Sequence, residues 1–486
     1  MDDNDARVAA DQLTGAGLRM LAGTIVDNAG VTRTKVIPVA RLRQAIESGV
    51  GLSPVFAVMC ADDGITESAS YGGPSGDMRL VPDISAAVLV DQSTGLGWAP
   101  LNQFDQELRP MEICSRQVLA RVTGSAAAAG ISYRMSFETE FTLFRPDGQG
   151  GWTFAHEGPG YSLRALIDTE AFVAELLAAM EEAGLGTELL HPEYTAGQME
   201  VSVAPAAPVA AADRLVLTRL LIARTARRHG LRASFAPVIV PGDVGNGCHL
   251  HFSAESDGVP LLGGGGGRYG MTARGEHLVA GLVAAVGEMA GLLAPSALSF
   301  TRLVPGHWSG AYACWGVENR EAAVRFIEGT ATSRPGSANC ELKCMDHAAN
   351  PYLAAAAVIA ATQDGLQRAL PLPDPVGEAP DSIPEAERQR RGIFRLPPDL
   401  GTALDSMEKS PLLRSALGEG LLGAFVAVHR HELAVFAGRP NRKWPLLCAG
   451  ATDTALQNGV TVPALRRHGC SVVVSRTRST HASPNH

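Results

Sequence analysis

Met135-Ser-Phe-Glu-Thr-Glu-Phe-Thr-Leu-Phe144 is the stretch of sequence that says most about the fold. Its apolar residues follow the pattern of a β-strand, and Glu138 and Glu140 stand two residues apart within it. Because side chains alternate across a strand, both carboxylates are expected on one face, with aromatic neighbours packed around them. Two such carboxylates repel each other unless a cation lies between them. An isolated pair of this kind is most often a solvent-facing acidic edge, so its meaning depends on the rest of the chain.

Further motifs of the same chemistry follow in order. The segment His191-Pro-Glu-Tyr-Thr-Ala-Gly-Gln-Met-Glu200 places two glutamates on either side of a turn, and Gly245-Asn-Gly-Cys-His-Leu-His251 brings two histidines onto the next predicted strand. Carboxylate oxygens dominate, and no cysteine pair with zinc spacing competes, so the set suits Mg²⁺ or Mn²⁺. The predicted ligands of two or more divalent cations are Glu138, Glu140, Glu193, Glu200, His249 and Glu341.

Three arginines lie close to this pattern. Arg302 opens the segment Arg-Leu-Val-Pro-Gly306, and Arg320 and Arg325 follow in Asn319-Arg-Glu-Ala-Ala-Val-Arg325. Guanidinium groups form fork-shaped, permanently charged contacts with carboxylates and phosphoryl oxygens. Any one of them alone would be read as a surface arginine. Beside a predicted metal site, the three together indicate a binding site for phosphoryl and carboxylate groups.

The composition is that of an ordinary globular protein. The 486 residues are 46% hydrophobic and 19% charged, with a net charge of −9 and eight scattered cysteines. The acidic balance argues against a nucleic-acid partner, and the scattered cysteines are expected to be reduced thiols. The acidic N-terminus has no apolar signal core, and the most apolar helical stretch, 278–294, contains Glu288, so we expect no membrane segment. These features predict a cytoplasmic protein.

The order of predicted elements indicates an α+β fold. Residues 24–38 read as a hairpin around Asn28-Ala-Gly30, within a small domain of short strands and turns. Beyond it, strands such as 135–144 and 198–203 alternate with helices such as 170–183 and 211–229. The predicted organisation is an N-terminal extension at 1–17, a small domain at 18–108, a large domain at 109–437 and an atypical tail at 438–486.

Taken together, the motifs resemble those of the glutamine synthetase family over roughly residues 18–437. The ordered features are Glu-x-Glu, His-x-Glu with Ala-Gly-Gln-x-Glu, Gly-x-Gly-x-His-x-His-x-Ser, Arg-Leu-Val-Pro-Gly, Asn-Arg-x4-Arg, and Glu341 before Ala348-Ala-Asn-Pro-Tyr-Leu353. The resemblance implies an N-terminal β-grasp domain and a catalytic domain with a curved antiparallel sheet and surrounding helices. It also implies a homo-oligomer, a dodecamer of two hexameric rings, with active sites between subunits.

The resemblance assigns roles to individual residues. Glu140, Glu193 and Glu200 match the ligands of one metal, and Glu138, His249 and Glu341 match those of the other. Arg320, Arg325 and Asp63 match catalytic positions, with Asp63 given to the neighbouring subunit's site. Ser253, His251 and Arg325 match ATP-binding positions. The expected substrate-binding residues are Arg302, Gly245, Trp308 and Lys343.

Departures from the family pattern bear on the substrates. Trp308 occupies the position of the glutamate that closes the ammonium site in glutamine synthetases, and an indole packs against an organic amine rather than deprotonating ammonium. This feature resembles the branch that makes γ-glutamylpolyamines and γ-glutamylethanolamide. On the acid side, Val244, Asn339 and Lys343 replace residues that hold glutamate, and lysine lacks the bidentate fork of arginine.

The predicted function is ATP-dependent ligation. The enzyme is expected to phosphorylate a carboxylate, foremost the γ-carboxylate of glutamate, and to condense the acyl phosphate with an organic amine, releasing ADP and phosphate. One alternative is a related ligase that uses another acid in specialised metabolism, and a second is an inactive ring-forming homologue. A third, phosphoryl transfer to a guanidino group, is disfavoured by the Asn-Pro-Tyr-Leu segment.

Overall fold

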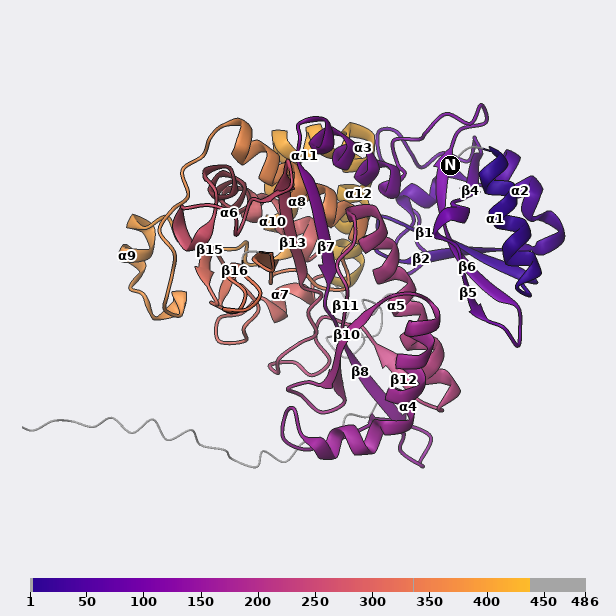
Figure 1. Ribbon diagram of the computed structural model, residues 1–486, viewed down its shortest axis with the longest axis horizontal. Helices are drawn as coiled ribbons and strands as arrows, with labels where there is room; N and C mark the ends of the chain where they lie inside the picture. Colours follow the sequence, from indigo (N-terminus) through magenta and orange to yellow (C-terminus); the bar gives the residue numbers. More distant parts are fainter. Residues whose placement is uncertain (1–2, 335, 438–486) are drawn as a thin grey trace, which may run out of the picture.

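The structure is a computed structural model that describes residues 3–334 and 336–437. A small N-terminal domain lies at one end of the molecule, and the larger catalytic region carries two further sheets with helices around them (Figure 1). The predicted α+β class, with a β-grasp domain before a catalytic domain built on a curved sheet, is confirmed. The predicted tail at 438–486 falls outside the described residues.

The N-terminal domain is a six-stranded sheet with two α-helices. Its strands are β1 (Met20–Val26), β2 (Thr32–Pro38), β3 (Val50–Leu52), β4 (Met78–Pro82), β5 (Val88–Asp91) and β6 (Leu96–Phe104), and its helices are α1 (Asp3–Gly15) and α2 (Leu42–Ser48). The order is β2-β1-β6-β4-β3, with β5 beside β6, and β1 runs parallel to β6. The predicted hairpin at 24–38 is confirmed as the antiparallel pair β1 and β2. The segment predicted as an extension contains α1.

The hairpin turn is fitted closely against the catalytic region. Gly30 has φ +74°, and a Cβ there would come within 2.2 Å of the Ala348 carbonyl oxygen. Asn350 caps the following helix and donates its amide to the Val26 carbonyl at 3.1 Å. The turn therefore requires glycine, and the two domains are joined by backbone contacts as well as by packing.

The catalytic region contains two sheets. The five-stranded sheet has the order β10-β11-β8-β12 with β9 beside β8, and the seven-stranded sheet has the order β14-β13-β17-β16-β15-β18 with β7 beside β13. The strands are β7 (Ser132–Phe137), β8 (Thr139–Pro146), β9 (Trp152–Phe154), β10 (Thr187–Pro192), β11 (Gln198–Val203), β12 (Arg232–Ser234), β13 (Leu250–Ser256), β14 (Val259–Pro260), β15 (Tyr312–Val317), β16 (Ala322–Ile327), β17 (Asn339–Leu342) and β18 (Phe394–Arg395). Within these two sheets, all described pairs are antiparallel except β15 with β16.

The prediction of one continuous strand over 135–144 is wrong. The chain leaves the seven-stranded sheet at Phe137 and enters the five-stranded sheet at Thr139, with Glu138 between them. At this junction the backbone N–H of Glu138 donates to the His249 carbonyl at 3.0 Å, and that of Glu140 donates to the Gly247 carbonyl at 3.3 Å. The two acidic residues are therefore delivered by different parts of the fold, although both reach the same cavity.

The helices cover the sheets and bury most of the core. They are α3 (Ser115–Ala128), α4 (Leu163–Glu182), α5 (Pro208–Arg228), α6 (Ala273–Leu293), α7 (Ser299–Arg302), α8 (Pro351–Gln367), α9 (Glu385–Arg390), α10 (Leu400–Lys409), α11 (Pro411–Leu417) and α12 (Glu419–Ala437). The helices predicted at 170–183 and 211–229 begin earlier than expected. Ser162 caps α4 through a hydrogen bond from Ala165, and Pro208 occupies the first turn of α5, where a missing N–H costs nothing.

Helix α6 is a buried core helix. In the described part of the chain it is the one helix that alone is long and apolar enough to cross a membrane, and 67% of that stretch is buried inside the protein. The bent pair α11 and α12 passes the same test only when counted as one broken span. Gly281 allows α6 to approach α8 closely, since a Cβ there would lie 2.2 Å from the Ala361 carbonyl oxygen.

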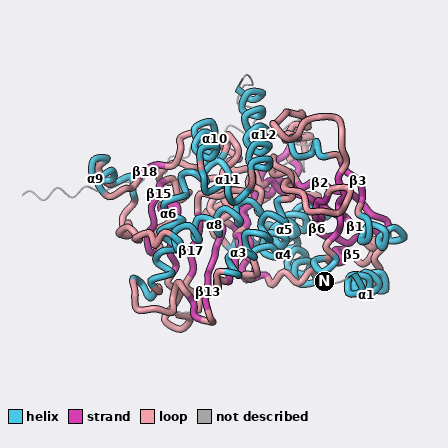
Figure 2. Tube along the Cα trace, turned by 90° about the horizontal axis from the view of Figure 1, so that it is seen from above, coloured by secondary structure: helices cyan, strands magenta, loops and turns pink. Residues whose placement is uncertain are grey.

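Helix α12 returns to the N-terminal domain, as Figure 2 shows from above. Its His429 contacts the Asn28 carbonyl at 2.9 Å through Nε2, and Glu432 accepts a hydrogen bond from the backbone N–H of Ala61 at 2.8 Å. These contacts hold the hairpin turn and the loop that carries Asp63. The last described helix thus fixes the position of the predicted inter-subunit loop.

Candidate active site

A row of three titratable side chains crosses the five-stranded sheet. Glu140 on β8 lies directly opposite Glu200 on β11, and Glu200 lies opposite His191 on β10. Residues opposite each other in a ladder project from the same face, so the three side chains point to one space. Ligand atoms of His191, Glu193 and Glu200 lie within 4.8 Å of one another.

The electrostatics of this row reflect crowding of negative charge. Burial raises the pKa of Glu140 to about 7, and repulsion from Glu200 and Glu193 adds to the rise. Burial also raises the pKa of Glu200. The hydrogen bond with Glu200 raises the pKa of His191 to about 9. A hard divalent cation would relieve this repulsion, so the carboxylates present here fit Mg²⁺ or Mn²⁺ by their chemistry.

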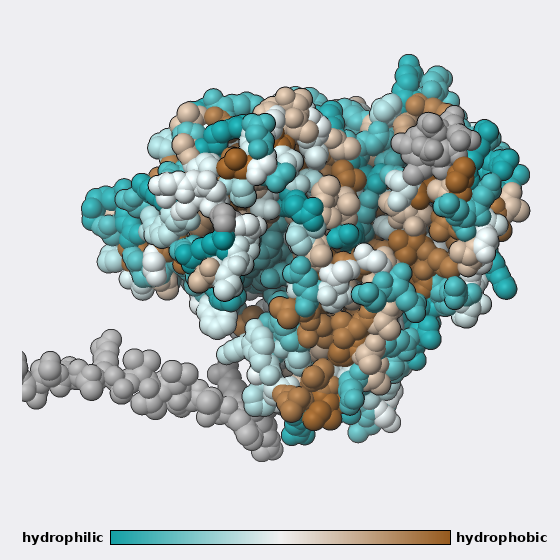
Figure 3. All heavy atoms as spheres, viewed as in Figure 1, coloured by the Kyte–Doolittle hydropathy of each residue, from teal (hydrophilic) through white to brown (hydrophobic). Residues whose placement is uncertain are grey.

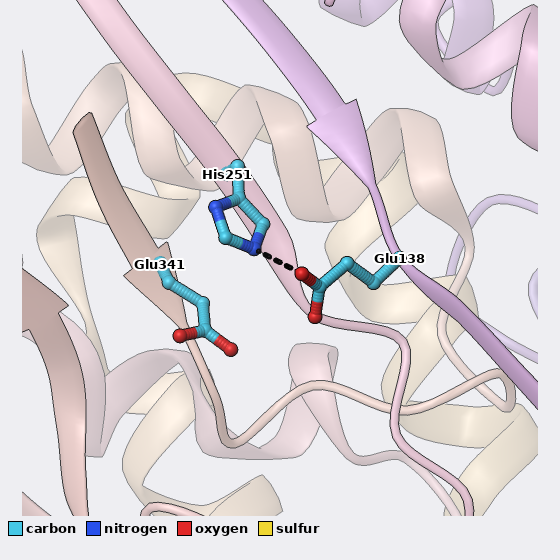
Figure 4. A group of neighbouring side chains, drawn as sticks. All are labelled: Glu138, His251 and Glu341. Carbon is cyan, nitrogen blue, oxygen red and sulfur yellow. Dashed lines mark ion pairs between the residues drawn. The ribbon is translucent and has the colours of Figure 1, made fainter. Parts of the chain in front are cut away.

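A second row crosses the seven-stranded sheet. Arg325 on β16 lies opposite Glu341 on β17, which in turn lies opposite His251 on β13. Figure 4 shows Glu341 and His251 projecting from their strands toward Glu138, with His251 Nε2 3.1 Å from Glu138 Oε1. Ligand atoms of Glu138, His251 and Glu341 also fall within 4.8 Å of one another.

His249 joins the two rows. Its Nδ1 lies 3.0 Å from Glu138 Oε2 and 3.2 Å from Glu341 Oε1, while its Nε2 lies 3.7 Å from Glu140 Oε1. The structure therefore brings together Glu138, His249 and Glu341, the residues expected to bind one metal. Gly247 makes this possible, because a Cβ there would lie 2.3 Å from His249 Nε2.

The carboxyl groups of Glu138 and Glu341 are held in the ionised form. Burial would raise the pKa of Glu138, but His251 and His249 outweigh burial and keep it well below its usual range. Burial acts in the same way on Glu341, where the charge of Lys343 and the two histidines lower the pKa to about 2. Ionised, buried carboxylates with an imidazole among them are a suitable ligand set for a divalent cation.

One cavity of about 360 Å³ connects these groups. Its lining includes most of the predicted site residues, together with aromatic residues and Val244. The lining residues are Glu138, Glu140, Tyr161, His191, Glu193, Tyr194, Gln198, Glu200, Val244, Gly245, His249, Arg302, Gly306, His307, Trp308, Arg320, Arg325 and Lys343. Carboxylates, cations and aromatic rings thus share one space.

Two of the cavity's cations are buried and fixed. Arg302 is 3% exposed and donates to the carbonyls of Met345 at 2.7 Å and Lys343 at 3.2 Å. Lys343, also 3% exposed, donates from Nζ to Glu341 Oε1 at 2.9 Å. The lysine that replaces an expected arginine therefore neutralises Glu341 instead of extending a fork into the cavity.

The other two arginines of the cavity differ from each other. Arg325 is bound at both ends of its guanidinium, to Glu341 Oε2 at 2.9 Å and to Glu318. Arg320 is exposed, and within 3–334 and 336–437 it has no ion pair or hydrogen bond. A free cation that lines a cavity is available to an anionic ligand such as a phosphate group.

The Gly-Asn-Gly turn shapes the wall next to Glu140. A Cβ on Gly245 would lie 1.9 Å from the Pro237 carbonyl oxygen, so only glycine fits. Gln198 donates to the Gly245 carbonyl and to Glu140 Oε2, each at 3.1 Å, and the Gly247 N–H donates to the same carboxylate at 2.8 Å. Glu140 is therefore oriented by a polar network.

An aromatic wall closes another side of the cavity. Trp308 and Tyr194 are each 56% exposed, and their ring centroids lie 6.2 Å apart. Tyr161 donates its hydroxyl to Glu193, and its ring lies 5.5 Å from that of His191. Exposed aromatic faces beside carboxylates form a surface suited to an organic cation.

Four predicted residues do not line the cavity. His251 and Glu341 stand behind it as contacts of Glu138 and Lys343. Ser253 lies two residues beyond His251 on β13, opposite Arg134 of β7. Asp63 lies in the N-terminal domain at φ +62°, with its side chain 75% exposed and 2.8 Å from Arg33 Nη1.

Sequence reasoning missed several cavity residues. His191 could have been predicted, because it stands two residues before the predicted ligand Glu193 and this spacing places both side chains on one face of a strand. Asn339, noted in the sequence only as a replacement, does not line the cavity, but its Oδ1 lies 2.9 Å from His251 Nδ1 and so helps to orient that ring. For Tyr161 and Tyr194 no local pattern exists, because tertiary structure alone brings them to the cavity.

The chain matches two family models along almost its whole length. Residues 6–112 match the glutamine synthetase N-terminal domain, and residues 112–444 match the glutamine synthetase catalytic domain. A gamma-glutamylpolyamine synthetase of Streptomyces coelicolor is 43% identical over 436 residues, which cover 89% of this chain and 93% of that protein. A glutamine synthetase of Pyrococcus horikoshii is 29% identical over 421 residues, covering 86% and 90%.

Solved structures give the same picture. A crystal structure described as a novel glutamine synthase homolog superposes with a TM-score of 0.78 at 36% identity, covering 88% of this chain and 97% of that one. A complex of GmaS with ADP superposes with a TM-score of 0.76 at 26% identity, covering 89% and 97%.

Proposed function

The chain belongs to the glutamine synthetase family, and from that premise we propose that it is an ATP-dependent ligase that joins a carboxylic acid to an organic amine. The observation that carries this proposal is the composition of one cavity, whose lining combines four carboxylates and the exposed Arg320 with the wall formed by Trp308 and Tyr194. Members of the family use ATP and divalent cations, and both kinds of ligand suit this cavity.

Each proposed metal site takes ligands from one of the two rows and from residues beside it. Glu140, Glu193 and Glu200 would hold one cation, and Glu138, His249 and Glu341 the other, with Mg²⁺ or Mn²⁺ as the candidates. When bound, such cations neutralise charge on phosphate oxygens. In support, ionised carboxylates that are buried near one another are costly without a counter-charge.

The proposed reaction has two stages. The γ-phosphoryl group of ATP moves to a carboxylate oxygen, which gives an acyl phosphate and ADP. The amine nitrogen then forms the amide bond as the bond from the acyl carbon to the phosphate oxygen breaks, and the proton lost by the nitrogen ends on the departing phosphate. Arg320 and Arg325 are proposed to stabilise the charge of the phosphoryl group in transfer, since preorganised cations act most strongly where charge develops.

Glutamate is the proposed acid, and a polyamine or another alkyl amine is the proposed partner. The similarity to a gamma-glutamylpolyamine synthetase supports this choice, and so does Trp308, which offers an aromatic face and no carboxylate. Val244 and Lys343 alter the acid side of the cavity, and they support a different acid as the second candidate. ATP would contact Ser253 and His251 in this proposal.

We also propose a cytoplasmic ring-shaped homo-oligomer, a dodecamer of two hexameric rings, with Asp63 completing the site of a neighbouring subunit. The exposed position of Asp63 supports this arrangement. So do apolar side chains left open, including Leu163 (70% exposed), Leu189 (63%) and Ile167 (61%). Figure 3 shows hydrophobic side chains gathered over the lower lobe, which carries α4, β8 and β10. Six described cysteines are buried free thiols, consistent with a reducing compartment.

The deciding experiment measures phosphate release from ATP and Mg²⁺ with glutamate and a panel of ammonium, ethanolamine, putrescine, spermidine and aromatic amines. Product masses identify the amide. We expect release with one organic amine and a γ-glutamyl product. Release with ammonium alone would overturn the proposed amine class. If no amine gives phosphate release and hydroxylamine with ATP gives no hydroxamate from any acid, the result would favour the inactive ring-forming homologue.

A further inference from the structure

Trp308 is held in an unusual backbone conformation. It has φ +53°, and it lies between Gly306 at φ +82° and Gly310 at φ +71°. The flanking positions carry glycine, which adopts this region freely, whereas the middle one carries a large side chain for which it is unfavourable. Because the Trp308 side chain is 56% exposed, core packing does not explain the conformation. Strain of this kind at a binding site points to a functional constraint.

A buried carboxylate supplies the compensating contacts. Glu321 Oε1 accepts the backbone N–H of Trp308 at 2.8 Å, and Oε2 accepts the backbone N–H of Gly306 at 3.2 Å. Glu321 is 8% exposed and does not line the cavity. Its two oxygens therefore act as a clamp on the turn at 306–308.

The clamp is itself anchored. The backbone N–H of Glu321 donates to Asn319 Oδ1 at 3.0 Å, and Asn319 Nδ2 donates to the carbonyls of Val376 at 2.7 Å and Glu378 at 3.0 Å. The same turn between β15 and β16 carries Arg320 into the cavity. The position of the Trp308 wall is thus tied to the segment that delivers the free cation.

We propose that Glu321 is a positioning residue for amine specificity: its carboxylate clamps the 306–308 turn and sets the indole of Trp308 against Tyr194 as the wall for the organic amine. This inference rests on the proposed ligase function. The ligand class is a primary amine with an alkyl or aryl body, because the wall offers ring faces and no carboxylate. Glu321 acts through Trp308 and touches no reacting atom.

The test compares wild type with Glu321→Ala, Trp308→Gly and the double variant in two assays. One assay uses the amine among ethanolamine, putrescine and spermidine that gives the wild type its fastest phosphate release. The other uses hydroxylamine, a small nucleophile that traps the activated acid without needing the wall. We expect Glu321→Ala to lower the ratio of organic-amine to hydroxylamine turnover about tenfold, through a raised KM for the amine, since small misplacements of binding groups are costly.

The double variant provides the sharper criterion. Because Glu321 acts through Trp308, the turnover ratio of the double variant should equal that of Trp308→Gly alone. If the two residues acted independently, the reductions caused by the two single substitutions would multiply in the double variant. Glu321→Gln keeps one acceptor oxygen and should give an intermediate ratio, which serves if the alanine variant does not fold. Glu276→Ala is the matched control, since Glu276, in the first turn of α6, accepts the backbone N–H of Arg268 at 2.9 Å and does not line the cavity.

Each outcome decides a separate point. An unchanged ratio in Glu321→Ala and Glu321→Gln, or multiplied effects in the double variant, would overturn the role of Glu321 while leaving the ligase function intact. A wild type that yields neither amide nor hydroxamate would instead overturn the ligase function, and the inference with it.

Discussion

Glu140 and Glu200 are directly opposed residues in the antiparallel ladder between β8 and β11. Their carboxyl groups therefore leave the same face of the sheet, and both are largely buried. Burial raises the pKa of both groups, and the charge of Glu200 adds to the rise at Glu140. The arrangement is unfavourable unless a cation lies between the carboxylates. The pair therefore suits cation binding, and it lowers the stability of the folded protein when no cation is bound.

Replacing Glu140 by alanine is expected to abolish catalysis without unfolding the protein. The variant loses a proposed metal ligand and the acceptor of the Gly247 and Gln198 hydrogen bonds. Loss of residues that merely orient ligands costs about 10–100-fold, so loss of a ligand should cost at least about 100-fold in ATP-dependent phosphate release. Glu255→Ala, at an exposed acid on β13, is the control. Undiminished turnover of Glu140→Ala would refute the metal assignment.

Metal binding should be visible as a change in stability. We expect Mn²⁺ or Mg²⁺ to raise the Tm of the metal-stripped protein, and a chelator to reverse the change, since a ligand at 100 times its Kd contributes about 2.7 kcal/mol. Glu200→Gln removes the charge of one proposed ligand, so the response of the variant to Mn²⁺ should shrink. Calorimetry with and without Mn²⁺ measures this response in the wild type and the variant. An equal Mn²⁺ response in wild type and variant would contradict the site.

Much of this site could be predicted because its motifs are local. Glu140, Glu200 and His249 each stand in a short segment whose chemistry is legible without the fold, and their order along the chain adds specificity. The strand prediction failed at Glu138 because the break depends on a hydrogen bond to the His249 carbonyl, more than a hundred residues away. Periodicity contains no information about that partner.

The amine side was less accessible to sequence reasoning. Trp308 stood out as a departure, but nothing near Glu321 indicated that its carboxylate would be buried beneath the 306–308 turn. Tyr194 follows a predicted ligand directly, yet its role depends on the approach of Trp308 from another segment. Such contacts form only when tertiary structure brings separate loops together, so they have no local signature.

Trp308→Glu should shift the amine preference. Glutamate and tryptophan are both unfavourable at φ +53°. The substitution therefore changes the chemistry of the side chain more than the strain of the backbone. It removes the ring face and adds a carboxylate, and we expect kcat/KM for the organic amine to fall about tenfold and ammonium to become a substrate. Product masses with each amine measure the change. Phe394→Glu, at an aromatic residue of similar exposure (57%) on β18, is the matched control, and an unchanged preference in Trp308→Glu would exclude this residue from the amine pocket.

Active sites shared between subunits should show complementation. Asp63→Ala and Glu140→Ala are each expected to be inactive, because one damages the loop that we propose completes a neighbouring subunit's site and the other damages the cavity of its own chain. When the two variants are co-expressed in equal amounts, random assembly makes roughly a quarter of the sites from two intact halves, and about that share of wild-type turnover should return. Glu140→Ala mixed with Arg325→Ala should restore nothing, since both changes lie in one cavity. If the first mixture also stays inactive while native mass spectrometry shows mixed oligomers, Asp63 does not serve a neighbouring site.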